Sequence, residues 1–211
     1  MSSFLQNHQR QPKLFVDLPS KGKWYTDSCL QDMQSTSVPV YGMNAMDEIL
    51  FKTPDALFTG RATAEVIHSC IPTILDPWEL VGYDIDFILI SMRISTYGDD
   101  MPVTTNCPKC STENQSRISL GKLLEGFDNY PLDFKFEEGG FEFNIRPITY
   151  KKTSEFSMQN YALQRELWQV QQIERTEANA LDLEKKLQDV YARTSLLNLE
   201  LAVSHIESIA K

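Results

Sequence analysis

The sequence predicts an α+β fold, with a small mixed core of two β-hairpins and helices followed by a C-terminal antiparallel helical hairpin. Short alternating runs of aromatic and β-branched residues flank turn signals, which is typical of hairpins. Between residues 44 and 98 the apolar residues recur with the period of helices. After Ile148 glycine disappears, and Gln, Glu, Leu and Ala dominate up to Lys211. We therefore divide the chain into a flexible arm (1–13), a mixed core (14–148) and a helical appendage (149–211).

The composition indicates a protein with a real core and an acidic surface. Of the 211 residues, 42% are hydrophobic and 10% aromatic, which argues against disorder. The formal net charge is -9 and the basic residues are scattered, so we expect no binding to nucleic acid. No run approaches the ~18 apolar residues of a membrane span. Four cysteines are ordinary for a reducing compartment, and we expect a soluble chain without membrane contact.

The first elements are short and extended. Leu14–Val16 starts a strand-like run, and Pro19 and Gly22 then mark a tight turn. Ser37–Met43 carries the β-branched and aromatic bulk of a strand. Pro39 within it favours an edge strand, because proline lacks the N–H that a central strand donates.

Helix start signals follow this strand. Asn44 is placed to cap a short helix. Thr53 before Pro54 restarts the helical pattern, with threonine as the cap and proline in the first turn. Gly60 is expected to separate two short helices.

The clearest helix start is Asp76, which is followed by Pro77 and, three residues after the cap, by Glu79. This is a capping-box pattern, and it predicts the start of a longer helix. Gly98 is well placed to end that helix in the left-handed conformation.

Two hairpins are predicted next. The first pairs Met101–Thr105 with Gln115–Leu120 across a knuckle that carries Cys107 and Cys110. The second pairs Leu132–Glu137 with Phe141–Arg146, and its Gly-Gly turn supplies positive φ angles. Alternating apolar residues predict that one face of the second hairpin is buried: Phe134, Phe136, Phe141, Phe143 and Ile145.

Two helices are expected in the appendage, over 153–173 and 177–209. Apolar residues recur at intervals of three and four in the second helix, which favours an antiparallel hairpin or one arm of a short coiled coil. The helices are expected to make helix-to-helix contacts, within one chain or between two chains.

Cys107 and Cys110 are candidate zinc ligands, because a Cys-x-x-Cys turn lets two thiolates converge on one ion. Zinc needs four ligands, so the rest would come from Cys29 in a loop or from the same pair of a symmetric partner. His68 and Cys70 are two residues apart on a helix, so their side chains diverge. The alternative is a knuckle that keeps its turn without a metal. A redox role is less favoured, because no helix begins at Cys107 to lower its pKa.

The sequence contains no recognisable catalytic motif. None of the three histidines stands in a hydrolase or metalloprotease pattern. Asp99-Asp100 is read as a solvated turn, and Gly139-Gly140 as a hairpin turn rather than a phosphate loop. We therefore predict that the chain is not an enzyme and has no certain cofactor.

The order of several motifs resembles the T4-like bacteriophage baseplate protein family. The resemblance covers residues 14–120, no single motif carries it alone, and the C-terminal helices match no family. The motifs are Leu18-Pro-Ser-Lys-Gly-Lys-Trp-Tyr25, Val40-Tyr-Gly-Met43, Asp47-Glu-Ile-Leu50, Lys52-Thr-Pro-Asp-Ala-Leu57, Val66-Ile-His-Ser-Cys-Ile71, Asp84-Ile-Asp86, Arg93-Ile-Ser-Thr-Tyr-Gly98 and Cys107-Pro-Lys-Cys110.

The resemblance implies a tail protein that promotes or joins assembly of the central hub of the baseplate in a contractile tail. Its site of action would be the host cytoplasm, and the virion baseplate if the protein stays in the particle. It implies other hub and tail proteins as partners and supplies no catalytic residue. Exposed partner surfaces are expected at the Pro-Ser-Lys-Gly turn, the knuckle and the C-terminal helices, and the last two are candidates for self-association.

The alternative hypothesis is a zinc-knuckle regulator that binds nucleic acid. It would need a basic stripe near Cys107, and the sequence offers Lys109, Arg117 and Lys122. Retention on DNA that depends on salt would support it.

Overall fold

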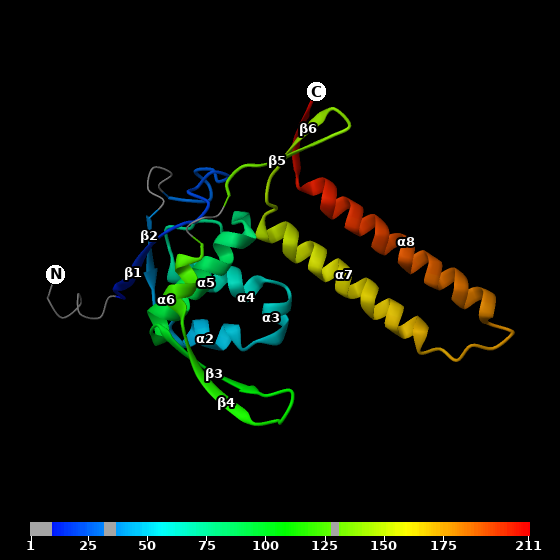
Figure 1. Ribbon diagram of the computed structural model, residues 1–211, viewed down its shortest axis with the longest axis horizontal. Coiled ribbons are helices and arrows are strands. Elements are labelled where there is room, and N and C mark those ends of the chain that lie inside the picture. Colours follow the sequence, from blue (N-terminus) through cyan, green and yellow to red (C-terminus); the bar gives the residue numbers. More distant parts are fainter. Residues whose placement is uncertain (1–9, 32–36, 128–130) are drawn as a thin grey trace. The chain divides into compact units, whose positions relative to one another are not determined.

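The computed structural model describes residues 10–31, 37–127 and 131–211. The fold is α+β, as predicted, with small antiparallel sheets, helices and a C-terminal helix pair (Figure 1). Its contacts divide the chain into two compact units, Met1–Leu132 (the N-terminal unit) and Asp133–Lys211 (the C-terminal unit). The division precedes the second hairpin, whereas the sequence pattern grouped that hairpin with the core.

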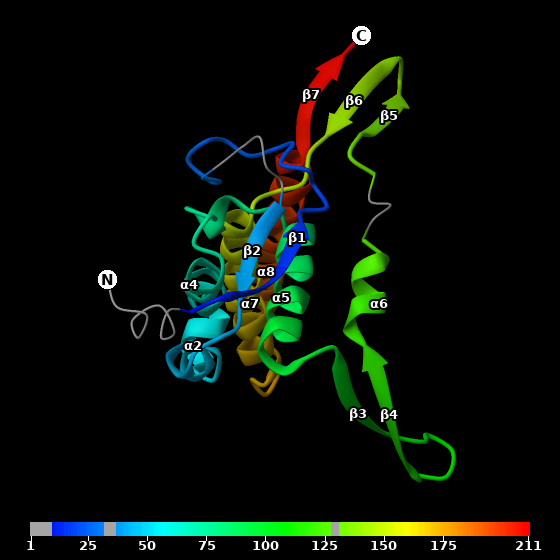
Figure 2. The same cartoon turned by 90° about the vertical axis from the view of Figure 1, so that its left-hand side faces the viewer.

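In the N-terminal unit, β1 (Pro12–Asp17) and β2 (Ser37–Tyr41) form a two-stranded antiparallel sheet that contacts α5 (Gly82–Tyr97) (Figure 2). Pro39 stands opposite Phe15 in this pair. Each strand of a two-stranded sheet is an edge strand, so the predicted edge position of Pro39 is confirmed. Val40 and Val38 alternate with outward residues and are buried.

Four helical segments precede α5 in the described chain: α2 (Ala45–Phe51), α3 (Pro54–Phe58), α4 (Arg61–Cys70) and the 3-10 turn η1 (Pro77–Glu79). Asn44 caps α2 as predicted, and Asp47 completes a capping box by accepting the Asn44 N–H at 2.9 Å. Gly60 separates α3 from α4 with a φ of 77°. The core lies between α4 and α5, where Val66, Ile67, Ile88 and Met92 are almost fully buried.

Two capping predictions need correction. Asp76 accepts the Trp78 N–H at 3.1 Å but opens only η1; α5 starts at Gly82, because Leu80 and Val81 are extended and bury their side chains in the core. Thr53 precedes α3 as predicted, yet its hydroxyl donates to the Ile49 carbonyl at 3.1 Å and makes no cap.

Gly98 ends α5 as expected, but in a different conformation from the one predicted. Its φ of 91° is positive, while its ψ of 176° is extended rather than left-handed helical. The chain therefore leaves the helix already directed into the next strand, which begins at Asp100.

The first hairpin consists of β3 (Asp100–Asn106) and β4 (Glu113–Ser119), with Met101 opposite Ile118. The helix α6 (Leu120–Glu125) follows directly. Leu120, predicted as the end of the strand, is instead the first residue of α6, where its side chain is buried.

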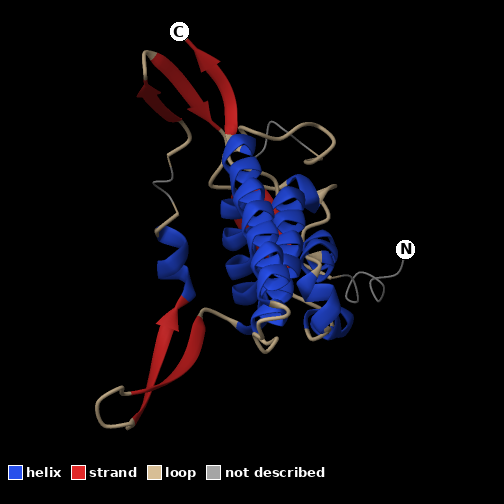
Figure 3. Ribbon diagram, turned by 90° about the vertical axis from the view of Figure 1, so that its right-hand side faces the viewer, coloured by secondary structure: helices blue, strands red, loops and turns tan. Residues whose placement is uncertain are grey.

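In the C-terminal unit, β5 (Phe134–Glu138), β6 (Phe141–Ile145) and β7 (Ile206–Ala210) form a three-stranded antiparallel sheet (Figure 3). Gly139 and Gly140 have φ angles of 59° and 80°, so the predicted tight turn is confirmed. The helices α7 (Tyr150–Gln171) and α8 (Ala180–Ser204) lie side by side as the predicted antiparallel hairpin.

The C-terminal unit departs from the sequence prediction in two ways. The last helix ends at Ser204 rather than near 209, because Ile206–Ala210 pairs with β6 as a third strand. The apolar face of the second hairpin is not fully buried: Phe136 is 48% exposed and Phe141 42%. Phe136 and Phe143 instead stack on each other across the strands, with ring centroids 4.7 Å apart. Alternation predicts which face is apolar but not what covers it.

No helix in the described ranges combines the length and the apolar character needed to cross a membrane.

Candidate functional site

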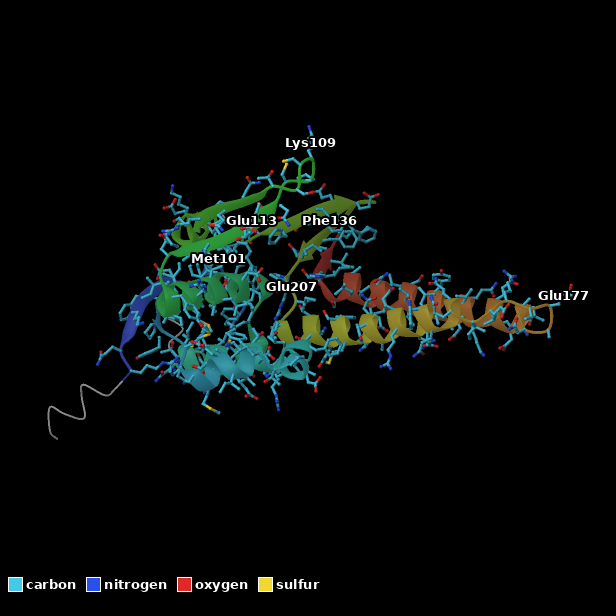
Figure 4. The ribbon with its side chains drawn as sticks, turned by 90° about the horizontal axis from the view of Figure 1, so that it is seen from below. Met101, Lys109, Glu113, Phe136, Glu177 and Glu207 are labelled. Atoms are coloured by element: carbon cyan, nitrogen blue, oxygen red, sulfur yellow. The ribbon has the colours of Figure 1, made fainter. Side chains whose placement is uncertain are left out.

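The cysteine knuckle (residues 107–112) closes the hairpin of β3 and β4. The Cys107 N–H donates to the Thr112 carbonyl at 2.9 Å, and the Ser111 N–H donates to the Cys107 carbonyl at 2.8 Å. Ser111 has a φ of 56°, a left-handed conformation that favours glycine. These two hydrogen bonds fold the turn back on itself, and Lys109 marks its tip in Figure 4.

Both thiols of the knuckle are accessible to solvent. Cys110 is exposed, Cys107 is half-buried, and both are free thiols. The Thr112 hydroxyl lies 3.2 Å from the Cys110 Sγ. Hydrogen bonds from the Thr112 side chain and backbone, and then from Cys107, lower the pKa of the Cys110 thiol. The knuckle thus presents two soft ligands, one of which is stabilised as a thiolate.

The other cysteines lie elsewhere in the N-terminal unit. Cys29 is fully buried, with its Sγ 3.5 Å from the Asp76 carbonyl, and burial raises its pKa to about 12. Cys70 is also buried, 3.2 Å from Arg10, and burial raises its pKa to about 11. Within the described residues no three His, Cys, Asp or Glu side chains gather as a metal site. Cys29, one of the two sources of further zinc ligands considered above, is therefore buried among other partners and does not join the knuckle.

The basic residues near the knuckle do not form a stripe of unpaired cations. Arg117 lies 3.7 Å from Asp100 in an ion pair on neighbouring strands. Lys122 is on α6, beyond the base of the hairpin, while Lys109 is at its tip. This placement gives the nucleic-acid hypothesis no positive support.

Other residues singled out by the sequence have local structural partners. The His68 Nδ1 lies 2.8 Å from the Ile74 carbonyl and the His205 Nδ1 lies 3.2 Å from the Arg146 carbonyl, while His8 is outside the described residues. Asp99 accepts hydrogen bonds from the Gly121 N–H and, at 2.8 Å, the Ser119 hydroxyl. The Gly121 bond is the main cause that lowers the pKa of Asp99. Asp99 therefore holds the junction of β4 with α6.

The Pro-Ser-Lys-Gly turn is anchored by a buried carboxylate that sequence reasoning missed. Asp84, fully buried in the first turn of α5, accepts the Ser20 N–H at 3.0 Å, the Ser20 hydroxyl and the Tyr25 hydroxyl at 2.6 Å. The Tyr25 oxygen in turn accepts the Val81 N–H at 3.1 Å. Burial raises the pKa of Asp84, and the hydrogen bonds from Ser20 and Tyr25 oppose that shift. The only signal in the sequence is an acid within an apolar helix.

This anchoring changes the expected role of the turn. Ser20 is fully buried and Gly22 is buried as well, whereas Lys21 is exposed. The turn is therefore a structural element held by Asp84 rather than a wholly exposed partner surface.

An open apolar surface does lie along α7 and α8. A hollow of about 340 Å³ is lined by Leu163, Leu196 and Leu197, and the ion pair of Glu166 with Arg193 (2.7 Å) stands beside it. Large apolar side chains are also exposed on these helices, including Trp168 (62%), Leu196 (56%), Leu199 (59%) and Val203 (55%). Such a surface suits helix-to-helix contact with a partner.

Comparison with known proteins identifies the family to which the chain belongs. The model of the family described as T4 bacteriophage base plate protein matches residues 41–210. The match thus reaches beyond residue 120 and includes α7 and α8, which the sequence reading could not assign. Neither the curated proteins nor the solved structures contain a significant match. Because the family model covers well over half of the 211 residues, the chain belongs to the T4 bacteriophage base plate protein family.

Proposed function

We propose that this baseplate protein is a non-enzymatic factor that promotes or joins assembly of the central hub through protein–protein contacts. The observation that carries the proposal is the family match over residues 41–210, which includes both exposed helices. The expected partners are other hub and tail proteins, and the expected place of action is the cytoplasm of the infected host.

The surface of α7 and α8 supports a role in binding proteins. Leu196 and Leu199 are more than half exposed on α8, and Leu196 also lines the hollow between the helices. Burying such side chains against a partner helix contributes roughly 1.5–3 kcal/mol each. A tail subunit with an amphipathic helix is the partner chemistry that this surface fits.

The polar clusters described above support a structural role over a catalytic one. Asp84 binds its own Ser20 and Tyr25, and Asp99 binds Ser119 and Gly121. Both carboxylates therefore use their hydrogen-bonding capacity to join elements of the fold.

The test is recovery of the tagged chain from infected cells, with mass spectrometry of what accompanies it and of purified virions. We expect hub proteins in the recovered complex. Presence in virions as well would make the chain a structural hub component, and absence would make it a transient assembly chaperone. Normal baseplates in infections that lack the chain would overturn the proposal.

Matched variants locate the binding surface. Leu196→Glu with Leu199→Glu places charge on the exposed apolar surface of α8, whereas Gln188→Glu adds a charge at an exposed polar position about two turns away on the same helix. We expect the double variant to lose its partners and the control to keep them. Equal recovery of partners by both variants would exclude α8 as the docking surface.

A further inference from the structure

The cysteine knuckle has the form of half a metal site. Cys107 and Cys110 are brought together by a turn in which Ser111 takes the left-handed conformation. The Thr112 hydroxyl lies 3.2 Å from the Cys110 Sγ. In the structure the Cys110 thiol donates to this hydroxyl, and after the thiol loses its proton the same hydroxyl is placed to donate to the thiolate. Such outer hydrogen bonds orient and support metal ligands.

The remaining ligands are not supplied by the part of the chain that the structure describes. No third His, Cys, Asp or Glu joins the pair there, and Cys29 and Cys70 are buried with other partners. Structural zinc sites hold four ligands in tetrahedral geometry. A knuckle of two thiolates is therefore incomplete unless another chain contributes.

We propose that two copies of this chain hold one Zn²⁺ between their hairpin tips, with Cys107 and Cys110 of each copy as its four ligands. A two-fold axis through the ion brings identical thiolate pairs together, which is the symmetry of most homodimers. A site of this kind needs no surface other than the tip itself.

Charge at the tip is compatible with this arrangement. Four thiolates around Zn²⁺ carry a net charge of about -2. Each copy brings one lysine, Lys109, between its two ligands, so the two lysines offset that charge. The flanking Asn106 and Ser111 are uncharged, and the Glu113 carboxylate accepts the Gln115 amide at 3.1 Å.

The hairpin is also accessible. Most side chains of β3 and β4 are exposed, and the two strands contact chiefly each other. A strand of seven residues spans about 20 Å. Figures 1 and 2 show the hairpin extending away from the helices of its own unit.

The experiment is metal analysis of the purified full-length chain, reduced and loaded with zinc, by elemental and native mass spectrometry. We expect one zinc ion per two chains. Substitution with Co²⁺ should give the strong thiolate-to-metal absorption of a four-sulfur tetrahedral site. Cys107→Ser with Cys110→Ser should lose the metal, while Cys29→Ala, which changes a buried cysteine outside the knuckle, should keep it.

Other stoichiometries decide against the proposal. One zinc ion per chain, no retained zinc, or a cobalt spectrum with fewer than four sulfurs would each overturn it. Because the cysteine variants could lose zinc simply by misfolding, the unmodified chain is also treated with a chelator. Zinc removal should be reversible, and the helical circular dichroism of the chain should not change. The result is independent of hub assembly, so its failure would leave the proposed function intact.

Discussion

Asp84 is the residue on which the N-terminal turn depends. Its carboxylate accepts three hydrogen bonds from Ser20 and Tyr25 in a site closed to solvent. Asp84→Ala leaves those donors buried and unpaired, which should lower the free energy of unfolding by on the order of 3 kcal/mol. Denaturant titration measures the loss. As a control, Asp86→Ala changes an exposed aspartate on the same helix and should cost no more than about 0.5 kcal/mol. Equal losses of stability in the two variants would show that the hydrogen bonds to Asp84 do not stabilise the fold.

The same carboxyl predicts a pH dependence. Burial raises the pKa of folded Asp84 above its unfolded value of about 3.9. Its contribution to stability is therefore fully present below pH ~4 and is lost as the pH rises through the folded pKa. Asp84→Asn cannot titrate, so the unfolding free energy of the unmodified chain minus that of the variant should fall as the pH rises from ~4 towards neutrality. Parallel curves for the two proteins across this range would contradict the assignment.

At the scale of the element, the turn between β5 and β6 depends on backbone conformation alone. Gly140 has a φ of 80°, and a Cβ built there would meet no atom within 4 Å. Gly140→Ala should therefore cost about 1 kcal/mol through strain rather than collision. Gly140→Asn should cost less, because asparagine tolerates positive φ. Amide exchange in β6 reports both effects, and identical protection in the two variants would refute a conformational cause.

Local rules predicted the elements whose cause is local. Asn44 with Asp47 caps α2, and Gly139-Gly140 turns the hairpin, because each depends only on neighbouring residues. The strand β7 was missed because Ile206–Ala210 continues a helical stripe and becomes a strand only by pairing with β6, some 60 residues earlier. Leu80 and Val81 likewise follow a good cap, but their backbone is extended because this conformation buries both side chains in the core.

In the candidate site, too, the features with a local cause were predicted and those that depend on distant residues were not. The knuckle was predicted from the Cys-x-x-Cys spacing, since a hairpin tip needs only adjacent residues. The buried cluster around Asp84 was not, because it joins residues 59 and 64 positions apart. The exposed state of Phe136 also escaped prediction, since alternation cannot say whether another layer covers a sheet.

At the scale of the whole molecule, charge decides between protein and nucleic-acid partners. The chain carries a formal net charge of -9, and Arg117 on β4 is already paired with Asp100. Binding to a phosphate backbone requires several clustered cations that release counterions. We therefore expect the zinc-loaded chain to pass through a DNA column at low and at physiological salt. A Lys109→Ala variant should behave identically, because one lysine at each tip cannot outweigh the net charge of -9 that each chain carries. Retention that weakens steeply with salt and is lost in Lys109→Ala would instead revive the nucleic-acid regulator and make the knuckle its contact point.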